Sequence, residues 1–441
     1  MGFAVIKKRV RKLKSQSGIS LVAAIFVTIL LTTISVVTLS VVVTDNRMTA
    51  NNIEASQAFW ASEAGIERAL LWLRNQDTPP SGTSPFTLYD NQTIGNGTYS
   101  VIIDPADDNP NHYIKQYTIE STGNGGVVSR QLQIQVRMST FGKYAYLSGN
   151  ENGSIWFYTG DVIEGPLHSN DQISIMGSPT FLGKVTSSYA SFVHGSVFHP
   201  VFRDGYQLGV PPITFPTSDE VLNNYYIENG SPPPLIIDAS GKKHARIVFN
   251  SNGEITYSVW HRKNHHTVYD IQNATANVSD LNGVIYVTDD VRLKGTLKGR
   301  LSVFATGNIF IVDDIRYSRA KPNGEPEENC TDMLGIISTK NVIVADTPPN
   351  RDNVVIDGAI LALGNSFYVQ NYRNGSPRGN LTIWGSLSQV VRGPVGTFSW
   401  DGSTTGYHKD YHYDQRLESQ IPPYYPTTGV YDVTAWREMM Y

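Results

Sequence analysis

Two clusters of histidine and aspartate carry side chains that could bind a metal ion. Their members are His408, Asp410, His412 and Asp414 in the first, and His261, His265 and His266 in the second. Two histidines four residues apart on a helix can share a zinc ion. The segment YHKDYHYD instead alternates aromatic and polar residues as a strand does, which would place its two histidines about 13 Å apart. We therefore expect surface or stacking histidines and no metal site.

Paired carboxylates are the second candidate chemistry. Asp289 and Asp290, and likewise Asp313 and Asp314, fall at expected turns between neighbouring strands. Enzymes that cleave polysaccharides use pairs of carboxylates, but Asp is also an ordinary turn residue. We expect these four residues to shape turns and not to catalyse. The acidic stretch DPADDNPN at 104–111 has oxygen ligands for calcium without the spacing of an EF-hand loop.

Other signatures of catalysis are missing from the sequence. Cys330 is the one cysteine, and it stands in a polar run without a neighbouring histidine motif, which is typical of an incidental thiol. With one cysteine no intramolecular disulfide can form, so packing must stabilise the fold. No GxSxG, HExxH, P-loop or GxGxxG pattern stands in a suitable context. We expect no enzymatic activity, no catalytic residue and no cofactor.

The charge distribution argues against a nucleic-acid partner. The net charge is −4, but six of the 35 basic residues lie within the first 18 residues, which hold no acidic residue. The rest of the chain has 29 basic and 39 acidic side chains. A chain with such an acidic excess binds polyphosphates poorly. The sequence shows no basic patch with interleaved aromatic residues that would offset it, so we predict no nucleic-acid partner.

A long apolar run follows the basic leader. The 25 residues from Ile19 to Val43 carry no charge. As a helix this run would be about 37 Å long, enough to cross a hydrocarbon core of about 30 Å. We therefore predict a membrane span. Its side chains include Leu21, Val22, Ala23, Ile25, Phe26, Leu30, Leu31 and Val43.

The predicted helix continues beyond the span as an amphipathic rod. No proline interrupts residues 44–74. Apolar residues spaced seven, four and three apart form one helical face, and this packing face is Phe59, Ile66, Leu70 and Leu73. A secretory signal peptide would have a shorter apolar core and a small-residue cleavage site. An ordinary signal anchor would explain the span and the basic leader, but not the Gly18 junction or the uninterrupted amphipathic half.

The basic leader, Gly18, the apolar half and the segment SEAGIERAL together resemble the N-terminus of type IV prepilins. The resemblance is closest to minor pilins with a PilX-type N-terminal segment, and it covers about the first 75 residues. It implies that a prepilin peptidase cuts between Gly18 and Ile19. It also implies assembly with other minor and major pilins on an inner-membrane platform.

Ala23 departs from the pattern of most major pilins, which carry Glu at this fifth mature position to neutralise the terminal amine of a neighbouring subunit. A carboxylate in hydrocarbon is costly unless it is paired. Its absence, together with the large ectodomain, indicates a subunit at the tip of a fibre.

Beyond the helix the sequence predicts mainly β structure. Residues 78–140 begin with a proline-containing linker and continue with strand-like runs at 97–103, 113–121 and 127–138. The segment TGNGG joins the last two runs and is typical of a hairpin. We expect a small antiparallel sheet packed on the amphipathic half of the helix.

Residues 141–400 consist of short apolar runs separated by Gly, Asn and Asp. One unit recurs at turn residues that lie 18, 33, 24 and 15 positions apart, namely Asp290, Asn308, Asn341, Asn365 and Asn380. Such recurrence favours an irregular parallel β-helix, in which each rung stacks on the next. An antiparallel β-sandwich is the alternative. Residues 200–280 interrupt the pattern and predict a loop insertion or a lateral subdomain.

The expected organisation has five parts. They are a leader at 1–18, a transmembrane and amphipathic helix at 19–77, a small sheet at 78–140, a β-helical ectodomain at 141–400 and a C-terminal cap at 401–441.

We expect a minor pilin that acts in pilus assembly and in adhesion or surface contact, with a surface or polysaccharide as its ligand. The precursor would span the cytoplasmic membrane once with its C-terminus outside, and the assembled protein would belong to the extracellular pilus. The alternative is a membrane-anchored β-helix protein that binds carbohydrate or degrades polysaccharide.

Overall fold

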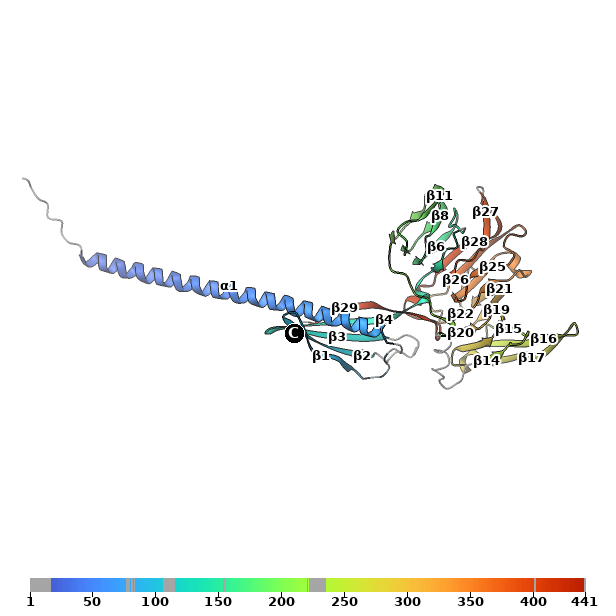
Figure 1. The fold of residues 1–441 in the computed structure, drawn as a ribbon, viewed down its shortest axis with the longest axis horizontal. Coiled ribbons are helices and arrows are strands. Elements are labelled where there is room, and N and C mark those ends of the chain that lie inside the picture. Colours follow the sequence, from blue (N-terminus) through green and yellow to red (C-terminus); the bar gives the residue numbers. More distant parts are fainter. Residues whose placement is uncertain are drawn as a thin grey trace, which may run out of the picture.

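The structure is a computed structural model that describes residues 17–76, 80, 82, 84–105, 116–153, 155–219, 221, 235–399 and 402–439. This part of the chain is mostly β, with one long N-terminal helix and an antiparallel sheet beside it, as the sequence predicts. Figure 1 shows a bare half of the helix, then a small body in which the helix lies on the sheet, then a large β body. We call residues 44–140 and 427–439 the small body, and residues 141–426 the large body.

Helix α1 runs without a break from Ser17 to Arg74. Large apolar side chains in its first half are not covered by the rest of the chain: Leu21 is 65% exposed and Phe26 is 69% exposed. Threonine hydroxyls in this half donate to carbonyls one turn earlier, as Thr28 Oγ1 does to the Ala24 carbonyl at 2.9 Å, so these hydroxyls need no water. By length and hydropathy, α1 is the one candidate membrane span among the described residues.

The small sheet has the strand order β1-β2-β3-β4-β29, and every neighbouring pair is antiparallel. Its strands are β1 (Phe86–Ile94), β2 (Gly97–Pro105), β3 (Gln116–Gly125), β4 (Val128–Thr140) and β29 (Thr427–Met439). The expected hairpin between β3 and β4 is present, and Gly126 takes the positive φ of +89° in its turn. The acidic stretch at 104–111, which lacks the EF-hand spacing, lies almost wholly outside the described residues.

Helix α1 approaches this sheet closely because both partners present small residues. Ala58 and Ala69 are fully buried, and a Cβ on Gly123 of β3 would collide with the backbone of Ala58 and Ser62. This contact needs glycine, since any side chain would push the helix off the sheet. The larger side chains of the interface are the buried Ile66, Leu70 and Leu73, with Phe59 half-buried at its edge.

The large body holds a mixed sheet of 22 strands and a separate pair, β8 with β11. Its strands are β5 (Tyr146–Asn150), β6 (Val162–Glu164), β7 (Leu167–Ser169), β8 (Ser174–Gly177), β9 (Thr180–Phe181), β10 (Val185–Ser187), β11 (Val193–Phe198), β12 (Val201–Phe202), β13 (Tyr206–Leu208), β14 (Leu235–Asp238), β15 (His244–Phe249), β16 (Glu254–Lys263), β17 (His266–Asn277), β18 (Val284–Thr288), β19 (Val291–Leu297), β20 (Arg300–Ala305), β21 (Ile309–Tyr317), β22 (Met333–Ser338), β23 (Val342–Val344), β24 (Val354–Ala362), β25 (Phe367–Val369), β26 (Pro377–Val391), β27 (Gly396–Ser399) and β28 (Gly402–Tyr413). Four short 3-10 helices accompany them: η1 (Phe141–Lys143), η2 (Val278–Asp280), η3 (Pro349–Arg351) and η4 (Gln415–Glu418). Among the described strands of the mixed sheet, only the pairs β15–β16, β16–β17 and β27–β28 are antiparallel.

One parallel ladder crosses the whole large body in the order β14-β18-β20-β22-β24-β26-β5-β7-β10-β13. The chain therefore enters in the middle at β5, reaches one end at β13, resumes at the other end at β14 and returns to the middle at β26. We call the pairings β26–β5 and β28–β6 the seam, because they join the first and last strands of the large body.

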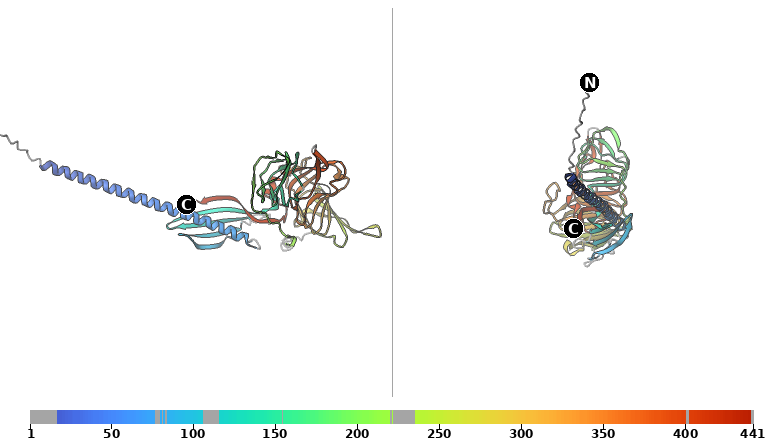
Figure 2. Two further views of the ribbon diagram at one scale, coloured as in Figure 1. Left: turned by 45° about the horizontal axis from the view of Figure 1, so that its top comes forward. Right: turned by 90° about the vertical axis from the view of Figure 1, so that its left-hand side faces the viewer.

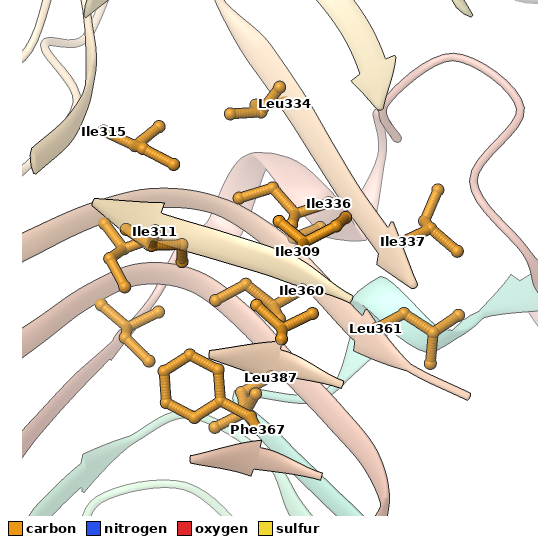
Figure 3. Close-up of a cluster of buried hydrophobic side chains, with 14 of the residues drawn as sticks. Ile309, Ile311, Ile315, Leu334, Ile336, Ile337, Ile360, Leu361, Phe367 and Leu387 are labelled. Carbon is orange, nitrogen blue, oxygen red and sulfur yellow. The ribbon is translucent and has the colours of Figure 1, made fainter. Parts of the chain in front are cut away.

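The interior of this body is filled by aliphatic side chains from successive strands. Figure 3 shows a cluster in which they stack from strand to strand: Ile309, Ile311, Ile315, Leu334, Ile336, Ile337, Ile360, Leu361, Phe367 and Leu387. Each of these side chains is at most 1% exposed. Burial of this kind is the main source of stability in a chain without a disulfide.

Strand β29 corrects the expected C-terminal cap. Residues 402–413 belong to the large sheet as β28, whereas β29 returns to the small sheet and pairs with β4, with Thr427 opposite Thr140. The large body is thus inserted between β4 and β29, and the chain enters and leaves it at one place. Figure 2 shows the described end of the chain beside α1, far from the large body.

The expected insertion at 200–280 is also smaller than predicted. Strands β12 and β13 at one end, and β14 and β15 at the other, pair in parallel with their neighbours in the large sheet. Only the hairpin β16–β17 projects, and Figure 1 shows it pointing away from α1. Its strands pair antiparallel because a two-residue turn, Asn264 and His265 with positive φ, connects them.

Candidate functional site

The seam holds a buried ion pair that joins strands far apart in the sequence. Arg392 Nη1 lies 2.6 Å from Glu151 Oε2, and the two side chains are 2% and 0% exposed. The guanidinium also donates to the carbonyls of Ile155 and Trp156, at 3.3 and 3.2 Å. Its carbon lies 3.9 Å from the centre of the Phe157 ring. Several partners thus compensate the burial of this charge.

A second ion pair lies beside the first. Lys409 Nζ on β28 is 2.6 Å from Asp161 Oδ2, with both side chains largely buried. Burial lowers the pKa of Lys409 below its ordinary value, against the opposing effect of Asp161. Asp161 also accepts the backbone N–H of Tyr158 at 3.0 Å. The two pairs together fix the loop 151–161 against the last strands of the large body.

An open cleft of about 410 Å³ adjoins these pairs. Tyr158 and Phe398 stack at one wall with ring centres 4.0 Å apart. Aromatic and polar side chains line much of the rest, including Trp156, Tyr372, Arg373, Tyr407, His408 and Lys409, and Ile155, Pro394 and Val395 add aliphatic surface. Such a lining can bind a polar ligand with flat apolar faces. The ammonium group of Lys409 at this cleft is engaged by Asp161.

The structure places His412 between two carboxylates. His412 Nδ1 lies 2.7 Å from Glu164 and Nε2 lies 2.9 Å from Asp410. Its ring stacks on Trp384 at 4.3 Å. Although burial lowers the pKa of His412, its hydrogen bonds to the carboxylates of Asp410 and Glu164 raise it above its ordinary value overall. His408 lines the cleft instead, so β28 separates the two histidines as its alternating sequence predicts.

The second histidine cluster is spread along the projecting hairpin. His261 Nδ1 lies 3.5 Å from Asp270, while His265 and His266 are exposed at the turn. Within the described residues, no group of three or more His, Cys, Asp or Glu side chains could hold a metal ion.

Asp289 and Asp290 lie in the expected turn, between β18 and β19, whereas Asp313 and Asp314 lie within strand β21, so the turn expected there is wrong. Asp290 accepts the backbone and side-chain N–H groups of Asn308, at 2.6 and 3.0 Å, and Asn308 accepts those of Asn341. Asn341 continues this ladder to the backbone N–H of Ser366 at 3.1 Å. Three of the five expected turn residues therefore form one stacked row.

The remaining aspartates and the cysteine have local partners. Asp289 holds a positive φ of +80°, Asp313 pairs with Lys294 at 3.3 Å, and Asp314 accepts the N–H of Val355 at 2.9 Å. Cys330 is buried, and burial raises the pKa of its thiol. A neutral, buried thiol is a poor nucleophile.

Sequence reasoning missed Glu151 and Arg392. The only signal was a charged residue directly after an apolar run, at Arg392 behind SLSQVV. Its partner lies 241 residues earlier, so nothing local identifies the pair. At the N-terminus, Gly18 and Ile19 lie in the backbone of α1, and the leader before Ser17 lies outside the described residues.

Comparisons with known proteins give limited matches. Residues 112–189 match a domain of unknown function, DUF4900. Among solved structures, the competence-associated pilin ComZ from Thermus thermophilus is similar at 12% identity and a TM-score of 0.35. This similarity covers 88% of the present chain and 97% of that chain. No curated protein matches.

Proposed function

We propose that the chain is a membrane-anchored, type IV pilin-like subunit that presents a β-helical ectodomain. The observation that carries this proposal is α1, a single unbroken helix with one bare apolar half and one half packed on an antiparallel sheet. A secretory signal would not continue without a break into the core of a folded body. The bare half would pack with the helices of other pilins after leaving the lipid.

The finer parts of the proposal concern the ectodomain. The ten-strand parallel ladder and the row from Asp290 to Ser366 support an irregular parallel β-helix. The engaged aspartates, histidines and thiol support a binding role and no enzymatic activity. We propose a minor pilin, processed by a prepilin peptidase and assembled on an inner-membrane platform, with a role in pilus assembly and surface contact.

Processing at Gly18 is the experiment that tests this assignment. Gly18→Leu should leave the precursor uncut, because a bulky side chain would block a peptidase that requires glycine before the cut. N-terminal sequencing of the membrane-extracted protein should then return the leader in place of Ile19. Gly2→Leu, a matched change within the leader, should leave processing intact. A wild-type protein that begins at Met1, or after Val43, would contradict the pilin assignment.

We further propose a position at the fibre tip. The large body adds residues 141–426 to one small sheet, and a shaft with closely spaced subunits would leave it no room. Ala23 also lacks the carboxylate that would pair with a subunit ahead. Immunogold labelling with antibodies to the large body should show one cluster at the end of each fibre. Regular labelling along the shaft would contradict this position, and Ala23→Glu should then improve incorporation.

A further inference from the structure

A basic and aromatic surface lies at the end of the large body that carries the projecting hairpin. We call it the arginine face, and its members are His244, Arg246, Trp260, Arg262, Tyr269, Arg292 and Phe310. They come from β15, β16, β17, β19 and β21, which the sheet brings side by side. Sequence reasoning found no basic patch with interleaved aromatic residues, because these residues are spread over more than 60 positions.

Strand register aligns the members in two rows. Arg246 lies opposite Arg292, which lies opposite Phe310. In the second row, Trp260 lies between His244 and Tyr269, with ring centres 5.5 and 6.2 Å away. Aligned residues on neighbouring strands are about 4.8 Å apart, so a row with two arginines lies beside a row of three rings.

Arg292 links the two rows. Its guanidinium carbon lies 5.9 Å from the centre of the Trp260 ring and 5.6 Å from that of Phe310. Burial lowers the pKa of Arg292, while the nearest acidic group, Asp290, acts in the opposite direction. Asp290 is already engaged by Asn308. The two rings and Asp290 therefore surround a half-buried charge that an anion would further stabilise.

The arginines of this face form no close ion pair within the described part of the chain. Among the described residues, no carboxylate oxygen lies within 4 Å of a side-chain nitrogen of Arg246, Arg262 or Arg292, although sixteen such ion pairs occur elsewhere. The charges of Arg292 and Arg262 also lower the pKa of His244, below the value that burial alone would give. Asp290 acts on both Arg292 and His244. Three arginines without a close ion pair still leave a positive surface that attracts an anion.

We propose that the arginine face binds a carboxylated polysaccharide, with carboxylates on the guanidinium groups and sugar rings against Trp260 and Tyr269. Guanidinium groups bind carboxylates through two parallel hydrogen bonds, and Tyr269, 45% exposed, offers a flat apolar face. The hairpin points away from α1, so a ligand outside the cell could reach it (Figure 1). This inference deepens the proposed function by naming the ligand class.

Charge density favours this ligand over a nucleic acid. A DNA duplex carries one charge per about 1.7 Å, and tight binding to it takes about six to ten basic contacts. The arginine face has three arginines, which are too few basic contacts for such binding. Outside its first 18 residues the chain also has ten more acidic than basic side chains, which would repel a nucleic acid. A polysaccharide with one carboxylate per sugar unit presents fewer charges over the same length, and it also has apolar ring faces for the aromatic side chains.

Binding of polygalacturonate by the full chain purified in detergent tests the proposal. The double variant Arg246→Ala with Arg292→Ala should bind at least about tenfold more weakly, because each arginine supplies a charge-assisted contact. Trp260→Ala should weaken binding several-fold, and Trp260→Phe, which keeps a ring, should restore most of it. Arg203→Ala, an exposed arginine without an ion pair at the other end of the large body, should leave binding unchanged.

Three outcomes would overturn the proposal. Polygalacturonate could fail to bind, or bind no better than neutral dextran. An equal loss in Arg203→Ala would show that overall charge, and not this face, holds the polymer. Tighter binding of single-stranded oligothymidylate, lost with the same double variant, would assign the face to nucleic acid. None of these results affects the Gly18 test, which depends on the leader and α1 alone.

Discussion

Arg392→Ala is expected to lower the free energy of unfolding of the large body by about 3–5 kcal/mol, the cost of leaving a buried charge without its partner. The change would strand Glu151, which is 0% exposed, and would remove the donors to the carbonyls of Ile155 and Trp156. It would also open the seam, where β5 and β6 meet the last strands of the large body. Denaturant unfolding in detergent, followed by tryptophan fluorescence, measures the loss.

Two further variants serve as controls for Arg392→Ala. Arg203→Ala removes an exposed arginine and should change stability by less than about 0.5 kcal/mol. Combining Arg392→Met with Glu151→Gln should cost less than the sum of the two single changes, since the double variant leaves no unpaired charge. If Arg392→Ala costs no more than Arg203→Ala, the ion pair does not hold the seam together.

The parts of the fold that sequence could predict are those set by neighbours in the chain. The length of α1 follows from an unbroken apolar and amphipathic pattern, and the β3–β4 hairpin from TGNGG. The row of Asp290, Asn308 and Asn341 follows from a recurring turn unit. Each signal lies within one element or one repeat.

Contacts between distant segments left no such signal. The pairing of β29 with β4 joins residues about 290 to 310 positions apart, and the seam joins residues about 240 apart. The alternating sequence of a strand does not indicate which of two sheets the strand will join. The C-terminal strand was therefore assigned to the wrong body, although its strand-like pattern was visible.

The candidate sites divide in the same way. Histidine and aspartate clusters were visible because their members are close in sequence, yet His412, Asp290 and Asp313 are each engaged by a local partner. The arginine face and the Arg392–Glu151 pair exist only after the strands stack. A linear search for charge clusters cannot find a surface that takes one or two residues from each of five strands.

Asp357 is a further charge that sequence reasoning did not single out, in the middle of the apolar strand β24. Its side chain is 0% exposed, its Oδ2 accepts the N–H of Tyr317 at 2.8 Å, and Arg316 Nε is 3.8 Å away. Burial raises the pKa of Asp357 to about 8, although the Tyr317 N–H and Arg316 act to lower it. The carboxyl group is therefore protonated in the folded protein at neutral pH.

Asp357→Asn should make the large body more stable than wild type by a margin that grows with pH. Below an unfolded pKa of about 3.9 both states hold the proton and the margin is small. As pH rises to about 8, the unfolded chain has released the proton and the folded chain has not, so wild type loses about 1.4 kcal/mol per pH unit. Above pH 8 both states are ionised and the margin stays constant, at about 6 kcal/mol by this slope. Unfolding in detergent at pH 5, 7 and 9 measures it, and Asp204→Asn, an exposed aspartate without an ion pair, is the control that should show no trend. An equal margin at pH 5 and pH 9 would mean that Asp357 is ionised in the folded protein throughout, held by Arg316 against the effect of burial.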